Sequence, residues 1–423
     1  MSTNPSYDQG LVKMRAGDVD GAIESFTRAI RQVPRDVYAY NKLAFLYKEK
    51  RLFRKAIRVL ETALKVRKDD FHTHYILGNT LLDQARYAEA AEAFKQSLSL
   101  NPKDVYAWNS LALAHKLVKQ YDRAIQCLEK AIELDPADAY NYNSLAVVHF
   151  CRGDLEQGAH ALERGLKHTP DNAFLAYTQG EAYLRMGQLA RSAECFSRLI
   201  ERAPQSKLGH IGLGHLAIAK AAWKSALAHF LRALELDPKD WEVLTFMGEI
   251  YLDMRDFEQA DVYFSRALDL NPRSSRGLLG KGETLESQGL VLKAWQCYQQ
   301  AVRAAPASAE SRFTLGRLYL EQRIFSKAVQ ELRAAHHLDA SNDTFASHLG
   351  WALVDGGWPA DGERLLRQVL AKNSSHACSL YQLARTLLAN GNRRDEAAGC
   401  LRALAGLKDG GDWKRKGREL MKP

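Results

Sequence analysis

The chain has 423 residues, of which 46% are hydrophobic, 26% charged and 9% aromatic. This composition is typical of a folded globular protein and excludes an intrinsically disordered, collagen-like or coiled-coil chain. A single hydrophobic core normally stops growing below this length, so we expect two or three domains or an array of small repeats. The formal net charge is +9 at pH 7, which favours an acidic partner for part of the surface.

The sequence shows no sign of a membrane span, a signal peptide or a metal site. It has no run of eighteen apolar residues, and its first ten residues lack the charged and apolar regions of a signal peptide. Its six cysteines include no C-x-x-C pair and its thirteen histidines no H-E-x-x-H motif. We therefore expect a cytoplasmic protein with buried free thiols, no metal and no cofactor.

Proline recurs at intervals of 34 or 68 residues. A small residue lies ten residues after each proline position, from Gly10 to Ala384; a second small residue follows twelve later, and a large apolar residue four after that. Small residues let two helices approach and large ones fill the space between them. The chain is therefore an array of 34-residue units. The prolines in register are Pro34, Pro102, Pro136, Pro170, Pro204, Pro238, Pro272 and Pro306.

Each period contains two amphipathic segments. Between Val105 and Pro136, for example, apolar residues recur every three or four residues in two blocks, which predicts two helices. A polar or glycine-containing turn such as Arg152 to Asp154 separates them. Pairs such as Asp135-Pro136 end the second helix, because proline disfavours helical geometry in the preceding residue. Each unit is thus predicted to be a hairpin of two helices, A and B.

These two small sites and the proline resemble the 34-residue pattern of the tetratricopeptide repeat family over nearly the whole chain. The resemblance implies an all-α fold, a right-handed superhelical solenoid of antiparallel helix hairpins. Units starting at residue 3 give about twelve repeats over residues 3–408. The first is weak in helix A, and the last begins at Ala377 with one extra residue near Gly391 to Arg394. Residues 409–423 are predicted to form a C-terminal capping helix, from Asp412 to Met421, and a basic tail.

The resemblance also implies that the A helices line a concave groove, with positions 2, 5, 9 and 12 of each unit facing it. Positions 2 and 5 form a ladder of aromatic and asparagine side chains. Asparagine both donates and accepts hydrogen bonds, and tyrosine offers an apolar face, so the ladder suits an extended polypeptide held by its backbone. Alternatively, the aromatic residues pack between neighbouring A helices. The ladder comprises Tyr38, Asn41, His72, Tyr75, Tyr106, Asn109, Tyr140, Asn143, Phe174 and Tyr177.

Beyond the fifth unit, position 9 carries Glu181, Glu249 and Glu283, with further carboxylates close by. A carboxylate row favours a ligand that brings Lys or Arg, through an attraction that salt weakens. Alternatively, this row is only a solvated acidic face.

A basic patch lies near the start of the chain, mostly on helix B of the second unit and outside the groove. It could contact an acidic protein, an anionic membrane surface or a nucleic acid. A nucleic acid is the least favoured of these partners, because Phe53 is the one aromatic residue among the Lys and Arg residues of the patch. The outer patch consists of Lys50, Arg51, Arg54, Lys55 and Arg58.

No catalytic motif is found: the sequence lacks a P-loop, a dinucleotide-binding glycine motif and a G-x-S-x-G elbow. We predict a non-catalytic scaffold or adaptor that binds an extended segment of a partner protein in its groove. One alternative is a substrate-recruiting subunit of an enzyme such as a glycosyltransferase; an RNA-binding repeat protein is another. Similar arrays on glycosyltransferases carry their asparagines at position 6, where this chain has Lys42, Ser110 and Ser144.

The family's clamp for chaperone C-terminal carboxylates is not matched. It needs Lys at position 5 and Asn at position 9 of one unit. Asn79 is the one asparagine at position 9, and its unit has Tyr75 at position 5. We therefore expect no tight binding of such tails.

Overall fold

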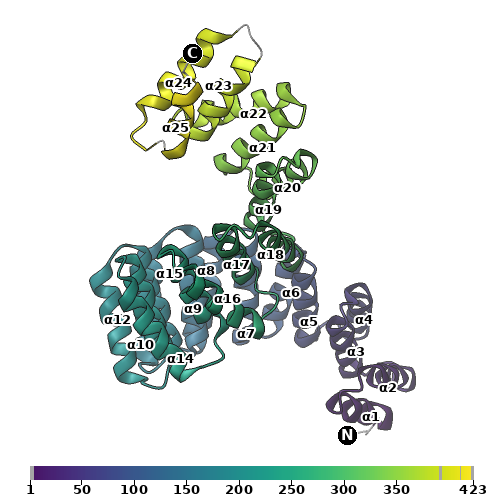
Figure 1. Cartoon of the computed structure of the whole chain (residues 1–423). Helices are drawn as coiled ribbons and strands as arrows, with labels where there is room; N and C mark the ends of the chain where they lie inside the picture. The colour runs from purple at the N-terminus through teal and green to yellow at the C-terminus, as the bar shows by residue number, and fades with distance from the viewer. Residues whose placement is uncertain (1–3, 390–392, 410, 421–423) are drawn as a thin grey trace. The chain divides into compact units, whose positions relative to one another are not determined.

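A computed structural model describes residues 4–389, 393–409 and 411–420. The described residues form helices and turns without a strand, and the helices alternate between A and B (Figure 1). The A helices are α1 (Pro5–Arg15), α3 (Val37–Glu49), α5 (Phe71–Asp83), α7 (Val105–Leu117), α9 (Ala139–Arg152), α11 (Ala173–Arg185), α13 (Leu208–Ala219), α15 (Trp241–Asp253), α17 (Ser275–Ser287), α19 (Ala309–Glu321), α21 (Asp343–Asp355) and α23 (Ala377–Ala389).

The B helices follow their A helices after short turns. They are α2 (Val19–Gln32), α4 (Phe53–Val66), α6 (Tyr87–Leu100), α8 (Tyr121–Leu134), α10 (Leu155–His168), α12 (Leu189–Arg202), α14 (Trp223–Leu236), α16 (Phe257–Leu270), α18 (Val291–Ala304), α20 (Phe325–Leu338), α22 (Pro359–Lys372) and α24 (Arg394–Gly406). The predicted all-α solenoid of helix hairpins is therefore confirmed, while the hand of its superhelix stays a prediction.

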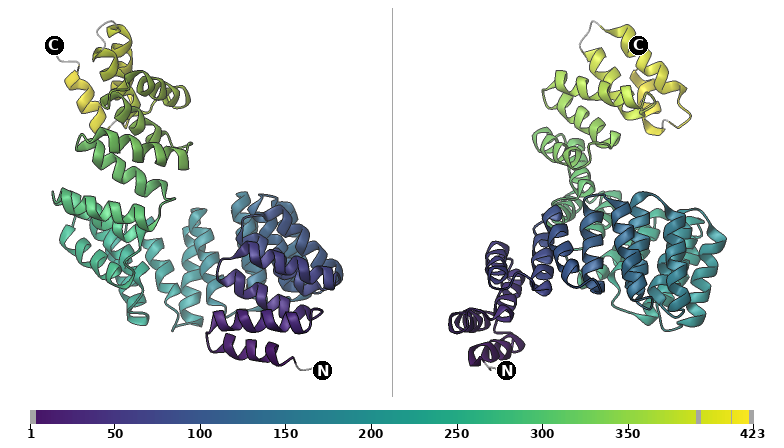
Figure 2. Two further views of the ribbon diagram at one scale, coloured as in Figure 1. Left: turned by 90° about the vertical axis from the view of Figure 1, so that its right-hand side faces the viewer. Right: turned by 180° about the vertical axis from the view of Figure 1, so that it is seen from behind.

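The chain divides into two compact units, residues 1–232 and residues 233–423. Within each unit, helices that are neighbours in the sequence pack side by side, as both views in Figure 2 show for successive colours. An A helix contacts its own B helix and the A helix of the next repeat. Each repeat therefore buries its apolar faces against its neighbours, as in a solenoid.

The small and large sites of the repeat meet inside each hairpin. A Cβ added to Gly78 would lie 2.5 Å from the ring of Phe94, and one added to Gly180 would lie 2.4 Å from the ring of Phe196. Both phenylalanines are fully buried. The glycine on helix A thus makes room for the ring on helix B, as the sequence pattern predicted.

The turns between helices A and B recur in the same register. A left-handed residue follows the A helix within two positions: Gly153 (φ 95°) is the first residue after its helix, and Gly17, Gly187, Arg51 and Lys119 (φ 78°, 71°, 57° and 60°) are the second. A residue in the left-handed conformation ends a helix, and the N–H groups around it donate hydrogen bonds to the last carbonyl groups of that helix. The turn therefore repeats every 34 residues whether or not glycine is present.

The first A helix begins with a side-chain cap as the middle ones do, whereas an additional helix follows the last repeat. At the N-terminus, helix α1 is capped by Asn4, whose side chain accepts from the N–H groups of Ser6 and Tyr7. At the C-terminus, helix α25 (Gly411–Leu420) packs against α23 and α24. The extra residue predicted near Gly391 to Arg394 falls mainly in residues 390–392, which lie outside the described residues.

Candidate partner-binding groove

The aromatic side chains at position 2 are the most accessible part of the predicted ladder. Tyr38, Tyr106, Tyr140 and Phe174 keep 62%, 73%, 62% and 55% of their surface in water, and His72 is also exposed. Exposure of this extent leaves most of each ring free of neighbouring A helices. These rings could therefore contact a ligand.

Asn41, at position 5, does not face a groove. It is 4% exposed, its Oδ1 accepts from Thr73 Oγ1 at 2.9 Å, and its Nδ2 donates to Asp70 Oδ2 at 3.4 Å. Thr73 is at position 3 of the next unit, so the amide joins two neighbouring A helices. Asn41 therefore differs from the sequence expectation, because a buried amide needs partners and the adjacent unit supplies them.

Asn109 is divided between the two roles. Its Nδ2 donates to Asn141 Oδ1, again at position 3 of the next unit, and to the carbonyl of Val105. Its Oδ1 is buried without a hydrogen-bond partner among the described residues. Half of this amide is thus used between units and half is left unsatisfied.

Asn143 lacks the junction that its counterparts make. Position 3 of the following unit is Leu175, which offers no polar group, and Asn143 Oδ1 is buried without a hydrogen-bond partner among the described residues. Asn109, Tyr140 and Asn143 line one pocket of about 160 Å³ between α7 and α9, together with Leu113. Two asparagines whose buried oxygens lack a hydrogen-bond partner among the described residues therefore line this pocket beside an exposed ring.

The position 5 tyrosines lie deeper. The rings of Tyr75 and Phe94 are 5.9 Å apart, as are those of Tyr177 and Phe196, and both tyrosines are half-buried. Each tyrosine rests on the phenylalanine that fills its own hairpin. Their first role is therefore packing, with one edge left towards solvent.

Glu181 and the other position 9 carboxylates lie in different compact units. Glu181, in residues 1–232, is 3.0 Å from His215 Nδ1 and is half-buried. Glu249 and Glu283, in residues 233–423, line a pocket of about 690 Å³ with Asp253. Glu249 and Glu283 therefore belong to one acidic site.

The acidic site is partly neutralised. Arg276 forms a bidentate pair with Glu249, and Arg317 donates to both oxygens of Glu286 at 3.0 and 2.8 Å. Partial removal from water raises the pKa of Glu283; Arg317 opposes this shift and nearby carboxylates, Glu310 foremost, add to it. The pocket retains an excess of carboxylate over guanidinium groups.

Sequence reasoning missed two residues of this site. Glu310 lines the larger pocket and Arg317 lines an adjoining one of about 440 Å³. They occupy positions 2 and 9 of the tenth unit, which are on the same predicted stripe. Continuing that stripe by one more unit would have found both.

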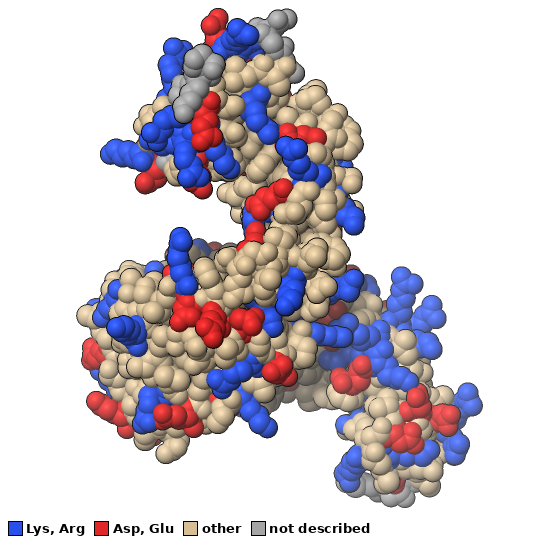
Figure 3. Space-filling view, in the orientation of Figure 1, with Lys and Arg blue, Asp and Glu red and all other residues tan. Residues whose placement is uncertain are grey.

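The basic outer patch spans the hairpin of α3 and α4, around which Lys and Arg side chains gather in Figure 3. All five of its residues are exposed. Lys50 pairs with Asp20 at 2.5 Å, Arg51 is the left-handed residue of the turn, and Lys55 lies 5.8 Å from the ring centre of Tyr47. Arg54 and Arg58 project from α4 with their guanidinium groups exposed.

The described part of the chain holds no group of three or more His, Cys, Asp or Glu side chains arranged to bind a metal ion. None of its helices is both long and apolar enough to cross a bilayer.

The repeated hairpins and the exposed A-helix surface define a helical-repeat protein of the kind that presents extended binding surfaces. Comparison with family sequence models identifies the kind of repeat. Tetratricopeptide repeat models match residues 7–47, 44–104, 105–138, 177–240, 242–274 and 293–343. The chain belongs to the tetratricopeptide repeat family.

Several solved structures are similar to this chain. The Cut9–Hcn1 hetero-tetramer of the APC/C aligns over 90% of this chain and 95% of its own, with 13% identity and a TM-score of 0.51. MamA aligns over 40% of this chain and 92% of its own at 24% identity, with a TM-score of 0.37. The human IFIT1 dimer with m7Gppp-AAAA aligns over 86% and 88% at 17% identity, with a TM-score of 0.45. The similarity to the Cut9–Hcn1 structure shows a shared fold.

Comparison with curated protein sequences gives no significant match.

Proposed function

We propose that this protein is a non-catalytic scaffold that binds an extended segment of a partner protein along its A helices. The observation that carries this proposal is the pair of unsatisfied oxygens, Asn109 Oδ1 and Asn143 Oδ1, in one pocket between α7 and α9. An unpaired buried acceptor costs free energy until a donor arrives. Peptide N–H groups of an extended segment supply such donors at regular intervals.

The exposed rings supply the rest of the interaction. Tyr106 and Tyr140 occupy the same position of consecutive units, and each lies three residues before one of the two asparagines. Tyrosine buries a large area at low entropic cost, and such residues dominate binding energies in protein interfaces. The two rings therefore contact the segment's side chains while the amides hold its backbone.

The acidic pocket of residues 249–317 sets a charge preference. Its carboxylates outnumber its guanidinium groups, so a Lys or Arg side chain of a partner gains from entering it. We propose that this second site favours basic residues in the bound protein. The basic outer patch of the α3–α4 hairpin would bind a different partner, an acidic protein or an anionic membrane surface.

The test begins with affinity capture and mapping of the bound segment on synthetic peptides. We expect Tyr106→Ala with Tyr140→Ala to weaken binding of that peptide at least tenfold, because each ring contributes on the order of 1–2 kcal/mol. Asn143→Asp keeps its acceptor oxygens and should bind nearly as well as the native chain, whereas Asn143→Leu should not. Leu292→Ala is the matched control, since Leu292 is an exposed apolar residue on B helix α18.

Equal affinity of the double variant, the Leu variant and the native chain would place the binding surface elsewhere. For the acidic pocket, Glu283→Gln should reduce binding of a Lys-containing peptide and its salt dependence. Glu258→Gln, at an exposed carboxylate of α16, should leave both unchanged.

A further inference from the structure

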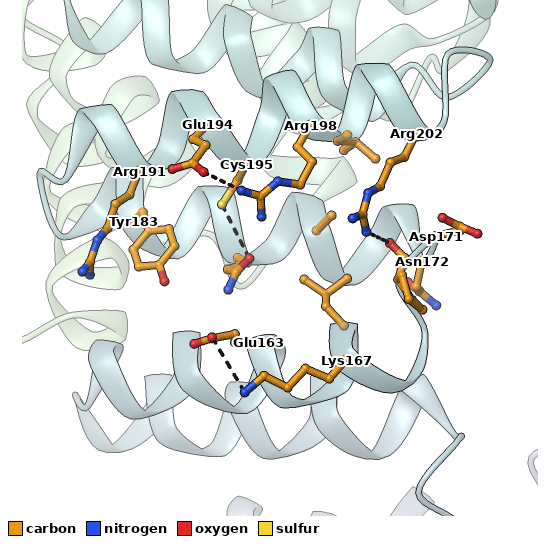
Figure 4. A pocket seen from close by; sticks show the side chains of 15 residues that line it. Glu163, Lys167, Asp171, Asn172, Tyr183, Arg191, Glu194, Cys195, Arg198 and Arg202 are labelled. Carbon is orange, nitrogen blue, oxygen red and sulfur yellow. Dashed lines mark hydrogen bonds and ion pairs between the residues drawn. The ribbon is translucent and has the colours of Figure 1, made fainter.

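A second pocket lies on the B-helix side of residues 1–232, between α10 and α12 with α11 as its floor (Figure 4). Its volume is about 480 Å³, within the range of about 300–1,000 Å³ common for ligand sites. The two preceding repeats carry an aromatic side chain of their own at the equivalent place.

In the fourth and fifth repeats, the side chain at position 4 fills the equivalent space. Trp108 Nε1 donates to the carbonyl of Pro102 at 2.9 Å, and Tyr142 Oη donates to the carbonyl of Pro136 at 3.2 Å. In both cases the ring side chain reaches back to the carbonyl of the preceding unit's proline. The sixth unit has Ala176 at this position. Its short side chain leaves both the space and the aromatic contact unfilled.

The fifth repeat shows what surrounds such a ring. Arg164 lies 5.9 Å from the ring centre of Tyr142, and His168 stacks on the same ring at 5.9 Å. Arg164 also forms a bidentate bridge to Glu129 on α8, at 2.7 and 2.8 Å, which closes the space over the ring. Tyr142 is 2% exposed as a result.

The sixth repeat keeps these surroundings but not the closure. Arg198 and Arg202 stand 34 residues after Arg164 and His168. Arg198 pairs with Glu194 of its own helix rather than bridging to Glu163, and Glu163 pairs with Lys167. Figure 4 shows both pairs on separate sides of the pocket. The space therefore stays open.

The charge of the pocket indicates the neighbours of an incoming ring. Arg202 donates to the carbonyl of Pro170 at 3.0 Å, and Arg191 donates to the side-chain oxygen of Gln188 at 3.0 Å and lies over the ring of Tyr183. These acceptors are neutral, and the pocket is lined by four Lys and Arg side chains against three carboxylates, those of Glu163, Asp171 and Glu194. Acidic residues that flank an incoming ring would pair with the guanidinium groups of Arg191 and Arg202.

We propose that this pocket binds a Trp or Tyr side chain of a partner polypeptide, flanked by acidic residues. The ring occupies the volume that Tyr142 fills one repeat earlier and lies against the Arg198 guanidinium, a favourable cation–π arrangement. Its polar group donates to an oxygen of the pocket, such as Gln179 Oε1 on the floor. This site is separate from the A-helix groove and does not rest on the function proposed for that groove.

The experiment uses the full chain and two fluorescein-labelled peptides, Glu-Asp-Trp-Glu-Asp and Glu-Asp-Ala-Glu-Asp, in fluorescence anisotropy titrations. We expect the Trp peptide to bind at least tenfold more tightly than the Ala peptide, and more weakly at 500 mM than at 50 mM salt. Ala176→Tyr restores the residue that the fifth repeat carries and should abolish binding of the Trp peptide. Arg198→Ala should weaken it severalfold, whereas the control Arg333→Ala, at an exposed arginine of α20, should not.

Several results would overturn the proposal. They are equal binding of both peptides, undiminished binding to a folded Ala176→Tyr variant, and no binding of the Trp peptide at about 1 mM. Circular dichroism and the unfolding temperature verify that the variant is folded; if it is not, Arg198→Ala decides alone. Self-association of the native chain that Ala176→Tyr removes would identify a second copy as the occupant and contradict a separate partner. Tyr106→Ala with Tyr140→Ala should leave peptide binding unchanged.

Discussion

The position of a residue in the repeat does not predict its pKa, and His348 is an example. His348 lies on α21 among aromatic rings, 5.0 Å from the ring centre of Phe313 and 5.9 Å from that of Trp351. Burial lowers its pKa to about 4; its hydrogen bond to the Thr344 carbonyl opposes the shift, and the positive charges of Arg317 and His376 add to it. The side chain is therefore neutral in the folded protein at neutral and mildly acidic pH.

This burial predicts a loss of stability in acid. The unfolded chain binds a proton at His348 below about pH 6.5 while the folded chain does not, so stability falls as pH drops from about 6.5 to about 4. His348→Gln should remove on the order of 1–2 kcal/mol of the difference in unfolding free energy between pH 7.5 and pH 5. Thermal unfolding at both pH values measures it.

The exposed His160 on α10 is the matched control. His160→Gln should leave the pH dependence unchanged. An identical acid loss in the native chain and the His348→Gln variant would show that His348 is not the titrating group.

At the scale of the helices, the junctions between repeats use polar side chains at positions 3 and 5. Asn41, Thr73 and Asp70 form one such network, and the N–H of Thr73 also donates to Asp70 at 2.9 Å. Ser379 donates to Ser347 at 3.0 Å at another junction. These bonds help to fix how one hairpin sits on the next, because the buried polar groups need partners and the adjacent unit supplies them.

Thr73→Val tests the first junction. Valine has nearly the shape of threonine but removes the hydroxyl that lies within hydrogen-bond distance of Asn41 Oδ1 and Asp70 Oδ2, which should cost about 1–3 kcal/mol. Thermal and urea unfolding measure the change. Thr62→Val is the control, because Thr62 is exposed on α4 and donates to its own helix at Arg58; a cost no larger than that of the control would contradict the role assigned to Thr73.

At the scale of the whole chain, the last repeat needs a cover for its apolar surface. Trp413 on α25 lies 5.9 Å from the ring centre of Trp351 and 5.4 Å from that of Tyr381. Gly417 of the same helix lies against Leu404. In an array where each repeat contacts only its neighbours, a terminal cap stabilises the repeats beside it most.

Removal of residues 409–423 should therefore lower the unfolding temperature of residues 233–423 by several degrees, since the half-buried Trp413 contributes on the order of 1–2 kcal/mol. Hydrogen exchange should rise in α23 and α24 and stay unchanged in α3 to α12. The exposed-residue variant Arg418→Ala should preserve protection. Unchanged exchange in α23 and α24 after truncation would show that α25 is not a cap.

The sequence by itself determined the hairpins, their period and their boundaries. Gly78 and Phe94, or Asp135 and Pro136, act within a few residues or one hairpin, so their effect can be derived from local spacing. The same register also located the exposed rings of Tyr106 and Tyr140.

Only the tertiary structure decided which side chains remain available. Asn41, Asn109 and Asn143 share one position and one residue type, yet the partner of each lies some thirty residues away, at position 3 of the next unit. Thr73 occupies the first, Asn141 takes one end of the second, and Leu175 leaves the third unsatisfied. The pocket over Ala176 arises in the same way. The short side chain leaves a space only because the surrounding helices α10 and α12 do not move together to fill it.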